Sequence, residues 1–204
     1  PESLTISSGL DAISHAFESV WNKNANPVSI GLATQSLAIS LKTLPELKKR
    51  PHDLANRSAM MSASLLAGMA ISQTRTALAH SISYPLTLGF DLPHGIACSF
   101  TLPELLKYNA VVDDGRLKRL AMILGYNNAL GLADALKELL LSLGVPHFLS
   151  ACELKEERAL ALTHEMLTPG RADNNLRPAS VDEVCTIVKD AFRCNSSLEN
   201  ENRG

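Results

Sequence analysis

Apolar residues recur at helical spacing along most of the chain. In the first such stretch, Leu10, Phe17 and Trp21 fall on one side of a helix, and Ser7 or Ser8 can cap its start. Prolines at favoured first positions and glycines after the last apolar residue mark out the remaining helices. The pattern predicts them over residues 27–42, with a short continuation over 45–50, and over 51–72, 74–88, 93–109, 116–124, 129–143, 153–167 and 181–192.

Two prolines fall inside these predicted helices. We expect Pro85 to bend the helix over 74–88 and Pro103 to kink or break the helix over 93–109. Aromatic residues make up only 4% of the chain, which argues against a β-sandwich or barrel. The predicted fold class is therefore all-α, a multi-helix bundle that forms one domain over residues 1–194. Residues 195–204 are polar, and we expect them to form a frayed tail.

Charge and cysteine usage exclude several classes of function. The 19 basic and 21 acidic residues give a net charge of -2, which provides no electrostatic footprint for nucleic acid or an anionic membrane. The four cysteines are far apart and include no C-x-x-C pair, so we expect reduced thiols rather than disulfides or a structural zinc site. No stretch is typical of a signal peptide. These features favour a cytoplasmic location.

A long central segment is poor in charge. Between Ser58 and Pro103 the only formal charges are Arg75 and Asp91. Such a segment is most simply the interior of the domain. Its two charges and its two histidines, His80 and His94, then need partners or a purpose, because unpaired buried polar groups cost free energy.

Four residues of the chain can together bind a metal ion. Asp11 and His15 are four positions apart, so they share one face of the first helix. Taken alone, they can equally be a solvent-exposed pair, and a histidine on an apolar face is more often a hydrogen-bonded core residue than a ligand. With His80 and His94 they make a set of three imidazoles and one carboxylate, which suits Fe²⁺ or Zn²⁺. Spacing alone does not show that the helices converge.

At these residues the sequence resembles the iron-containing, metal-dependent alcohol dehydrogenases. The resemblance covers almost the whole chain. It rests on the runs GLDAISHAFE at 9–18, AHSISYPL at 79–86 and LPHG at 92–95, with SLLAG at 64–68 and NLRP at 175–178 as further similarities. It implies that Asp11, His15, His80 and His94 bind the catalytic metal and that the domain is the all-helical C-terminal half of the enzyme.

The resemblance also implies a reaction and a cofactor. Family members transfer hydride between a small alcohol or aldehyde and NAD(P), which an N-terminal α/β domain binds. This chain has no G-x-G-x-x-G motif after a predicted strand, so we expect the NAD(P)-binding domain to be absent from it and the cofactor-binding residues to lie elsewhere. We expect the isolated chain to bind metal without turning over alcohols. A homodimer is compatible with the resemblance.

Three further residues are candidates for catalysis and substrate binding. Many family members carry a histidine four residues after the third metal ligand, whereas this chain has Tyr84 there; it can relay a proton or simply pack. Arg75 can pair with Asp91 or bind an anionic substrate, and Arg171 is a second candidate for such binding. The segments TRTAL at 74–78 and FDLPH at 90–94 resemble maleylacetate reductases, and SISYPL at 81–86 resembles phosphonoacetaldehyde reductases.

Two other classes of function stay open on the residues alone. A metal-dependent hydrolase or lyase would use the ion to activate water, although a positioned general base is not evident. A non-catalytic helical interaction module would use its histidines structurally. It predicts no bound metal and no change in thermal stability with a chelator.

Overall fold

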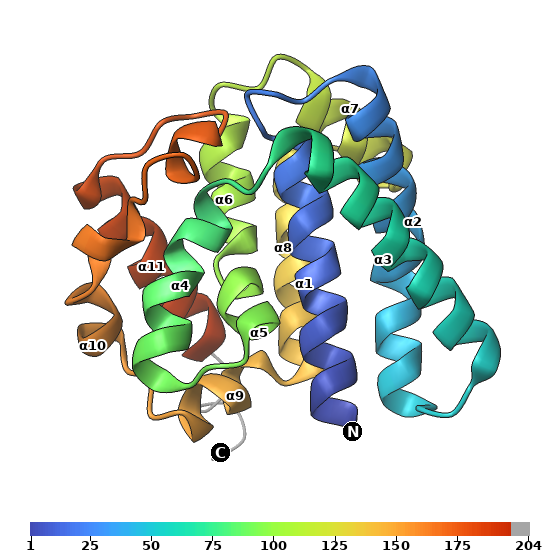
Figure 1. The fold of residues 1–204 in the computed structure, drawn as a ribbon, viewed down its shortest axis with the longest axis horizontal. Helices are drawn as coiled ribbons and strands as arrows, with labels where there is room; N and C mark the ends of the chain where they lie inside the picture. The colour runs from blue at the N-terminus through green and yellow to red at the C-terminus, as the bar shows by residue number, and fades with distance from the viewer. Residues whose placement is uncertain (197–204) are drawn as a thin grey trace.

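The computed structural model describes residues 1–196 as an assembly of helices (Figure 1), which confirms the predicted all-α class. The longer helices are α1 (Glu2–Val20), α2 (Pro27–Lys49), α3 (Leu54–Thr74), α4 (Leu78–Phe90), α8 (Ala129–Leu143) and α11 (Val181–Ser196). The shorter ones are α5 (His94–Ser99), α6 (Leu102–Ala110), α7 (Arg116–Ile123), α9 (Val145–Ala151), α10 (Glu156–Leu160), η1 (Thr163–Met166) and η2 (Ala172–Asn174).

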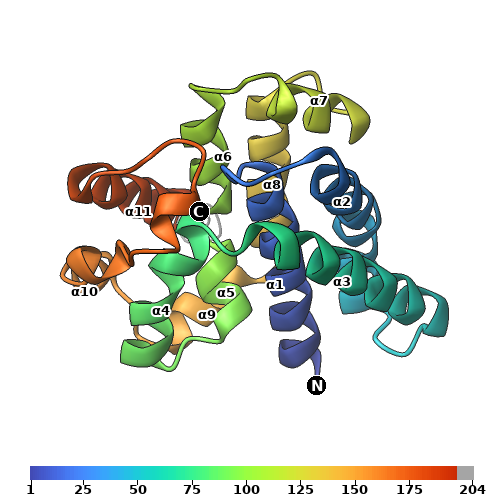
Figure 2. The ribbon, with the colours of Figure 1, turned by 45° about the horizontal axis from the view of Figure 1, so that its top comes forward.

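Helix α1 runs through the centre of the bundle. In two views α2 and α3 lie on one side of it, and α4, α5, α10 and α11 lie on the other (Figures 1 and 2). Leu10, Ile13, Phe17 and Trp21 are fully buried, as the apolar stripe predicts. The apolar core packs around this helix and includes residues from every helix of the described chain. None of the helices in residues 1–196 has the length and hydrophobicity that crossing a bilayer requires.

The start of α1 differs from the prediction. The helix begins at Glu2 rather than at Ser7 or Ser8. Ser8 does not cap it, because its hydroxyl donates a hydrogen bond to the carbonyl of Leu4 one turn earlier. Nothing in the first turn interrupts a helix that begins directly after Pro1.

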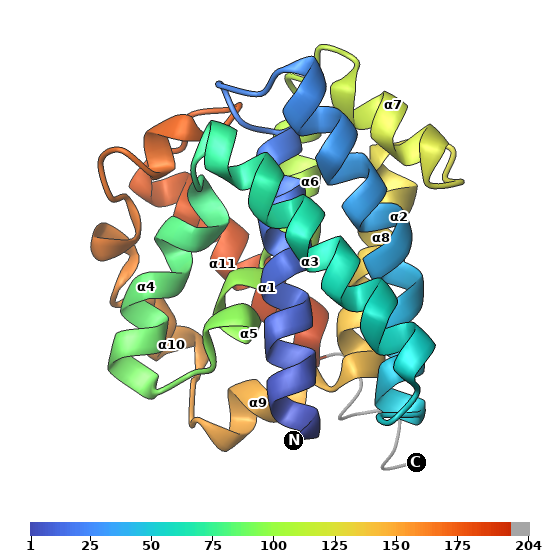
Figure 3. The ribbon, with the colours of Figure 1, turned by 45° about the vertical axis from the view of Figure 1, so that its right-hand side comes forward.

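Helices α2 and α3 form an antiparallel pair beside α1. Asn26 caps α2 through a reciprocal pair of hydrogen bonds with Ser29, and α2 continues through Pro45 without the predicted interruption. Helix α3 lies at the front of the view in Figure 3, with no helix in front of it. Its side chains Met61, Leu65 and Met69 are 74%, 65% and 48% exposed. The charge-poor segment is therefore only partly interior.

The prolines of the central segment occupy different positions relative to the helices. Pro85 lies inside α4, as expected. Pro93 immediately precedes α5, and Pro103 lies in the first turn of α6, so the predicted helix over 93–109 is two helices separated at Phe100 and Thr101. Proline suits a first turn because the amide hydrogen that it lacks has no partner there.

The C-terminal third departs most from the prediction. The predicted helix over 153–167 is divided into α10 and η1, and the unpredicted α9 follows Gly144, which has a positive φ of 85° and ends α8. Helix α11 includes Asn195, which we expected in the tail. The remainder of the predicted tail, residues 197–204, lies outside the described residues.

Candidate metal centre

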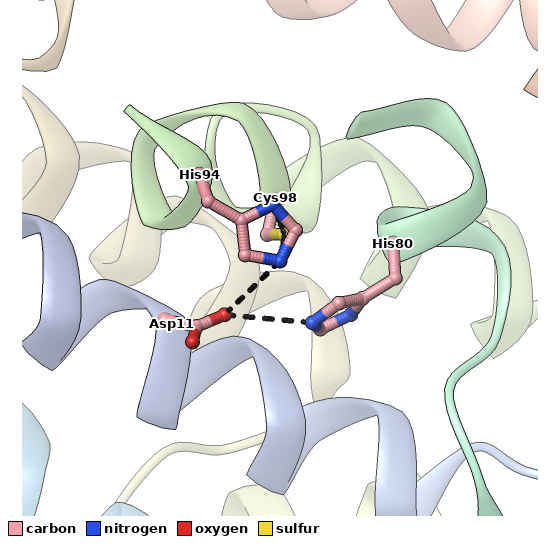
Figure 4. A group of neighbouring side chains, drawn as sticks. All are labelled: Asp11, His80, His94 and Cys98. Carbon is pink, nitrogen blue, oxygen red and sulfur yellow. Dashed lines mark hydrogen bonds and ion pairs between the residues drawn. The ribbon is translucent and has the colours of Figure 1, made fainter. Parts of the chain in front are cut away.

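Three helices bring a carboxylate and two imidazoles to one point. Asp11 comes from the middle of α1, His80 from the first turn of α4 and His94 from the start of α5. The Asp11 Oδ1 atom lies 3.5 Å from His80 Nε2 and 3.8 Å from His94 Nε2 (Figure 4). Ligands at about 2.0–2.3 Å around a tetrahedral ion are separated by about 3.3–3.7 Å, so the spacing is suitable for one ion.

A glycine allows α5 to approach α1 this closely. A Cβ atom built on Gly95 would lie 1.8 Å from the backbone oxygen of Ser7 and 3.0 Å from the backbone nitrogen of Asp11. Only a residue without a side chain fits at this distance. Gly95 therefore places the neighbouring His94 beside Asp11.

Glu18 is a residue of this centre that the sequence analysis did not assign. It is fully buried on α1, and its Oε2 atom lies 2.7 Å from His80 Nδ1. It lies three positions after His15 and seven after Asp11, so it shares their helix face. That helical spacing is the signal by which it could have been found.

The two facing atoms of Asp11 and His80 have no hydrogen-bond partner. Asp11 Oδ1 and His80 Nε2 are both buried, and neither satisfies its polar capacity within the protein. When Nε2 carries no hydrogen, each atom presents a lone pair to the other, and a proton or a metal ion between them would satisfy both. The donor set of one carboxylate oxygen and imidazole nitrogens fits Fe²⁺ or Zn²⁺.

The pKa directions agree with a site that attracts a cation. Burial lowers the pKa of His15 and His94, which favours the neutral imidazole that binds metals. Burial raises the pKa of Asp11, but the interactions with His80 and the other two imidazoles lower it by more, so the net shift of this pKa is downward. Burial lowers the pKa of His80, but the carboxylates of Glu18 and Asp11 outweigh burial and raise it.

Cys98 also reaches this centre, although the sequence analysis treated it only as a reduced thiol. One ligand atom each from Asp11, His80, His94 and Cys98 lie within 4.8 Å of one another. The Cys98 Sγ atom is 3.5 Å from Nε2 and 3.7 Å from Nδ1 of His94, so it faces the ring rather than one nitrogen. Burial raises the pKa of this thiol, which favours its neutral form.

His15 lies at the edge of the centre. Its Nε2 atom is 3.9 Å from Asp11 Oδ1, and its ring stacks on that of His80 with centroids 4.6 Å apart and an interplanar angle of 9°. It therefore contacts Asp11, as the i, i+4 spacing predicts, but it is not one of the four residues whose ligand atoms lie within 4.8 Å of one another.

Tyr84 and Arg171 lie next to His94. The rings of Tyr84 and His94 have centroids 5.8 Å apart, and the Arg171 guanidinium lies 4.3 Å from the centroid of the Tyr84 ring. Asn174, just after Arg171, donates a hydrogen bond to the backbone oxygen of Thr76 and so ties this loop to the start of α4. The guanidinium is therefore held one side chain away from His94.

Of the two alternatives for Arg75, the structure does not show the ion pair with Asp91. It is exposed at the end of α3 with a positive φ of 66°, and no ion pair within residues 1–196 joins it to Asp91. Its backbone oxygen accepts a hydrogen bond from the side chain of Asn22. The structure therefore gives the guanidinium of Arg75 no ion-pair partner at Asp91, and its role in substrate binding stays a prediction.

Known proteins are similar to this chain in sequence. Residues 5–192 match the C-terminal region of the Fe-containing alcohol dehydrogenase family. The 1,3-propanediol dehydrogenase of Klebsiella pneumoniae is 30% identical over 200 residues, covering 94% of this chain and 52% of that protein. The phosphonoacetaldehyde reductase of Streptomyces viridochromogenes is 34% identical over 164 residues, covering 78% of this chain and 41% of that protein.

A solved structure is similar to this chain in its fold. The sulfoacetaldehyde reductase of Bifidobacterium kashiwanohense, determined in complex with NAD+, superposes with a TM-score of 0.85 at 29% identity and covers 97% of this chain and 51% of that chain. The chain thus spans about half the length of the relatives that it matches. It belongs to the Fe-containing alcohol dehydrogenase family and corresponds to the all-helical, metal-binding C-terminal domain of that family.

Proposed function

We propose that this chain is the metal-binding half of an NAD(P)-dependent alcohol dehydrogenase or aldehyde reductase. Asp11, His15, His80 and His94 would hold the divalent ion, Fe²⁺ or Zn²⁺. The observation that carries this proposal is the pair of buried, unsatisfied atoms, Asp11 Oδ1 and His80 Nε2, which face each other at 3.5 Å. When bound, the ion supplies Lewis-acid polarisation of an alcohol or carbonyl oxygen during hydride transfer with the nicotinamide.

The proposed ligands differ in how far they are exposed to solvent. His80 is 1% exposed and anchors the inner side, whereas Asp11, His15 and His94 are 27–39% exposed and can be reached from solvent. A substrate would therefore approach from the side of His94. Tyr84 lies on that side and can donate a hydrogen bond to the substrate or relay a proton from it.

The other two classes of function fit this geometry less well. A hydrolase needs a free general base, but Asp11 faces the imidazoles and both oxygens of Glu18 already accept hydrogen bonds. An interaction module with structural histidines gives no reason for two buried polar atoms, Asp11 Oδ1 and His80 Nε2, to face each other without a hydrogen-bond partner.

Elemental analysis of the purified chain tests the proposal. We expect about one equivalent of iron or zinc in the wild type and almost none in a His80→Ala variant, because this substitution removes the most buried donor. We also expect the isolated chain to show no NAD(P)-linked turnover of alcohols. Equal metal content in the two proteins would show that the ion is held elsewhere, and a wild type without metal would refute the site.

Tyr84→Phe should change the pH dependence of alcohol oxidation by the complete enzyme. The substitution keeps the ring beside His94 but removes the hydroxyl that can carry a proton. We expect the loss of a proton relay to slow oxidation about 100-fold or more where deprotonation limits the rate. Rate profiles between pH 6 and 10 measure this effect, and superimposable profiles would leave Tyr84 a packing role only.

We further propose that the substrate carries an acidic group, which Arg171 binds. The names of two relatives, phosphonoacetaldehyde reductase and sulfoacetaldehyde reductase, denote aldehydes with an acidic group. In this chain the Arg171 guanidinium stacks on Tyr84, next to His94, where it can meet the far end of a short substrate. Arg75, which is exposed at the end of α3, is the second candidate for this role.

Arg171→Met should lower the preference of the complete enzyme for anionic over neutral aldehydes. A hydrogen bond to a charged group is worth about 1.5–3 kcal/mol, so the ratio of kcat/KM values should fall about 10-fold to 100-fold. The same measurement on Arg75→Met tests the second candidate, and Arg119→Met on α7 controls for the loss of an exposed guanidinium. An unchanged ratio would remove the substituted arginine from substrate binding.

A further inference from the structure

Glu18 makes three hydrogen bonds to one short segment of the chain. Its Oε2 atom accepts from the backbone N–H of Ala77 at 2.8 Å and lies 2.7 Å from His80 Nδ1, and its Oε1 atom accepts from the backbone N–H of His80 at 3.2 Å. Glu18 and His80 are 62 positions apart in the sequence. The carboxylate is fully buried, so these contacts replace its hydration.

The same carboxylate fixes both the backbone and the ring of His80. Ala77 is the N-cap residue of α4, and its own side chain supplies no capping hydrogen bond. Glu18, which lies on α1, supplies the capping hydrogen bonds instead. It does so at the N-terminal end of α4, where the helix dipole favours a negative charge. Because His80 is held at its N–H and at its ring by one group, the direction of the ring relative to α4 is determined.

The hydrogen-bond count assigns the proton of the ring. An ionised carboxylate can only accept hydrogen bonds, so His80 Nδ1 must carry a hydrogen. In the neutral imidazole the lone pair is then on Nε2, the atom that faces Asp11 Oδ1 without a partner. The contact between Glu18 and Nδ1 therefore decides which ring nitrogen is available as a donor.

We propose that Glu18 is a positioning residue of the metal centre, which holds His80 with Nδ1 protonated and Nε2 directed at the ion. This inference rests on the proposed function, since it concerns the same site. Glu18 does not bind the ion itself, because both of its oxygens are committed to α4. A buried carboxylate in this position also makes the imidazole a stronger donor.

Glu18→Gln tests the role with little change in shape. The amide offers one oxygen and one NH₂ group to three N–H donors, so at least one donor meets another donor. We expect the affinity for Zn²⁺, measured in competition with a chromophoric chelator, to fall about 10-fold to 100-fold. Ser81→Ala, next to His80 on α4, is the matched control. The Ser81 hydroxyl bonds to the backbone of Met166 and Thr168 and to none of the proposed ligands, so the Zn²⁺ affinity of this variant should stay that of the wild type.

NMR of the zinc-loaded wild type provides a second readout that does not depend on any variant. Nitrogen shifts of His80 should identify Nε2 as the zinc-bound atom and Nδ1 as protonated, with a far-downfield proton at Nδ1. Zinc at Nδ1, or a folded Glu18→Gln protein with wild-type affinity, would overturn the inference while leaving the proposed function intact. A wild type that binds no zinc would overturn both.

Discussion

Gly95→Ala is expected to destabilise the domain and to separate the two halves of the metal centre. The new methyl group would lie 1.8 Å from the backbone oxygen of Ser7, so α5 must move away from α1. Overpacking of a well-packed contact costs about 1–3 kcal/mol, and here backbone must shift on both sides, so we expect about 3 kcal/mol. Urea unfolding measures the loss of stability, and a Zn²⁺ titration measures the loss of affinity as His94 moves from Asp11.

Gly68→Ala supplies the control for this substitution. Gly68 lies within α3, and a Cβ atom there would meet nothing within 4 Å. Alanine favours a helix over glycine by up to about 1 kcal/mol, so this variant should be slightly more stable and should keep its metal affinity. If Gly95→Ala behaves in the same way, the close contact between α1 and α5 does not limit the position of His94.

Removal of the metal is expected to lower the melting temperature of the loaded chain by about 5–10 °C. An ion at a free concentration 100 times its Kd stabilises the native state by about 2.7 kcal/mol, and a domain of this size shifts by about 2–4 °C per kcal/mol. Differential scanning calorimetry with Zn²⁺ and then with an excess of chelator measures the change.

His80→Ala distinguishes binding at this centre from binding elsewhere. The variant lacks the innermost donor, so its melting temperature should not respond to Zn²⁺ or to the chelator. An equal response in wild type and variant would place the stabilising ion at another site. No response in either protein would favour the structural interpretation of the histidines.

The sequence predicts the parts of the site that local spacing controls. Asp11 and His15 are one turn apart on a helix with a clear apolar stripe, and the structure brings them within 3.9 Å. The approach of His80 and His94 depends on long-range packing, which includes the contact at Gly95. Spacing did not reveal this approach, and only the resemblance to a family implied it.

Glu18 shows how a local signal can be overlooked. It continues the helix face of Asp11 and His15, but a glutamate near the end of a helix is most often solvated, and nothing in the sequence shows that its partner, His80, lies 62 positions away. On α3 the absence of charge led to the opposite error, because an uncharged segment was expected to be buried. Met61, Leu65 and Met69 lie in an uncharged segment and are nevertheless exposed.

Helix boundaries were least predictable where competing local bonds decide them. Ser8 can cap a helix or bond back to the preceding turn, and in this chain it bonds back to Leu4. Pro45 can end a helix, but α2 continues through it. The division of 153–167 into α10 and η1 follows no apolar period that the sequence displays.

The contrast between the core and the ligands has a consequence for the order of folding and metal loading. The apolar core draws on every helix of the described chain, whereas the proposed ligands come from α1, α4 and α5 alone. We expect burial of that core not to depend on an ion, in contrast to small zinc modules that remain unfolded without metal. We therefore expect newly synthesised chains to reach the helical state first and to acquire the ion afterwards, so that metal scarcity would yield folded but unloaded protein rather than aggregates.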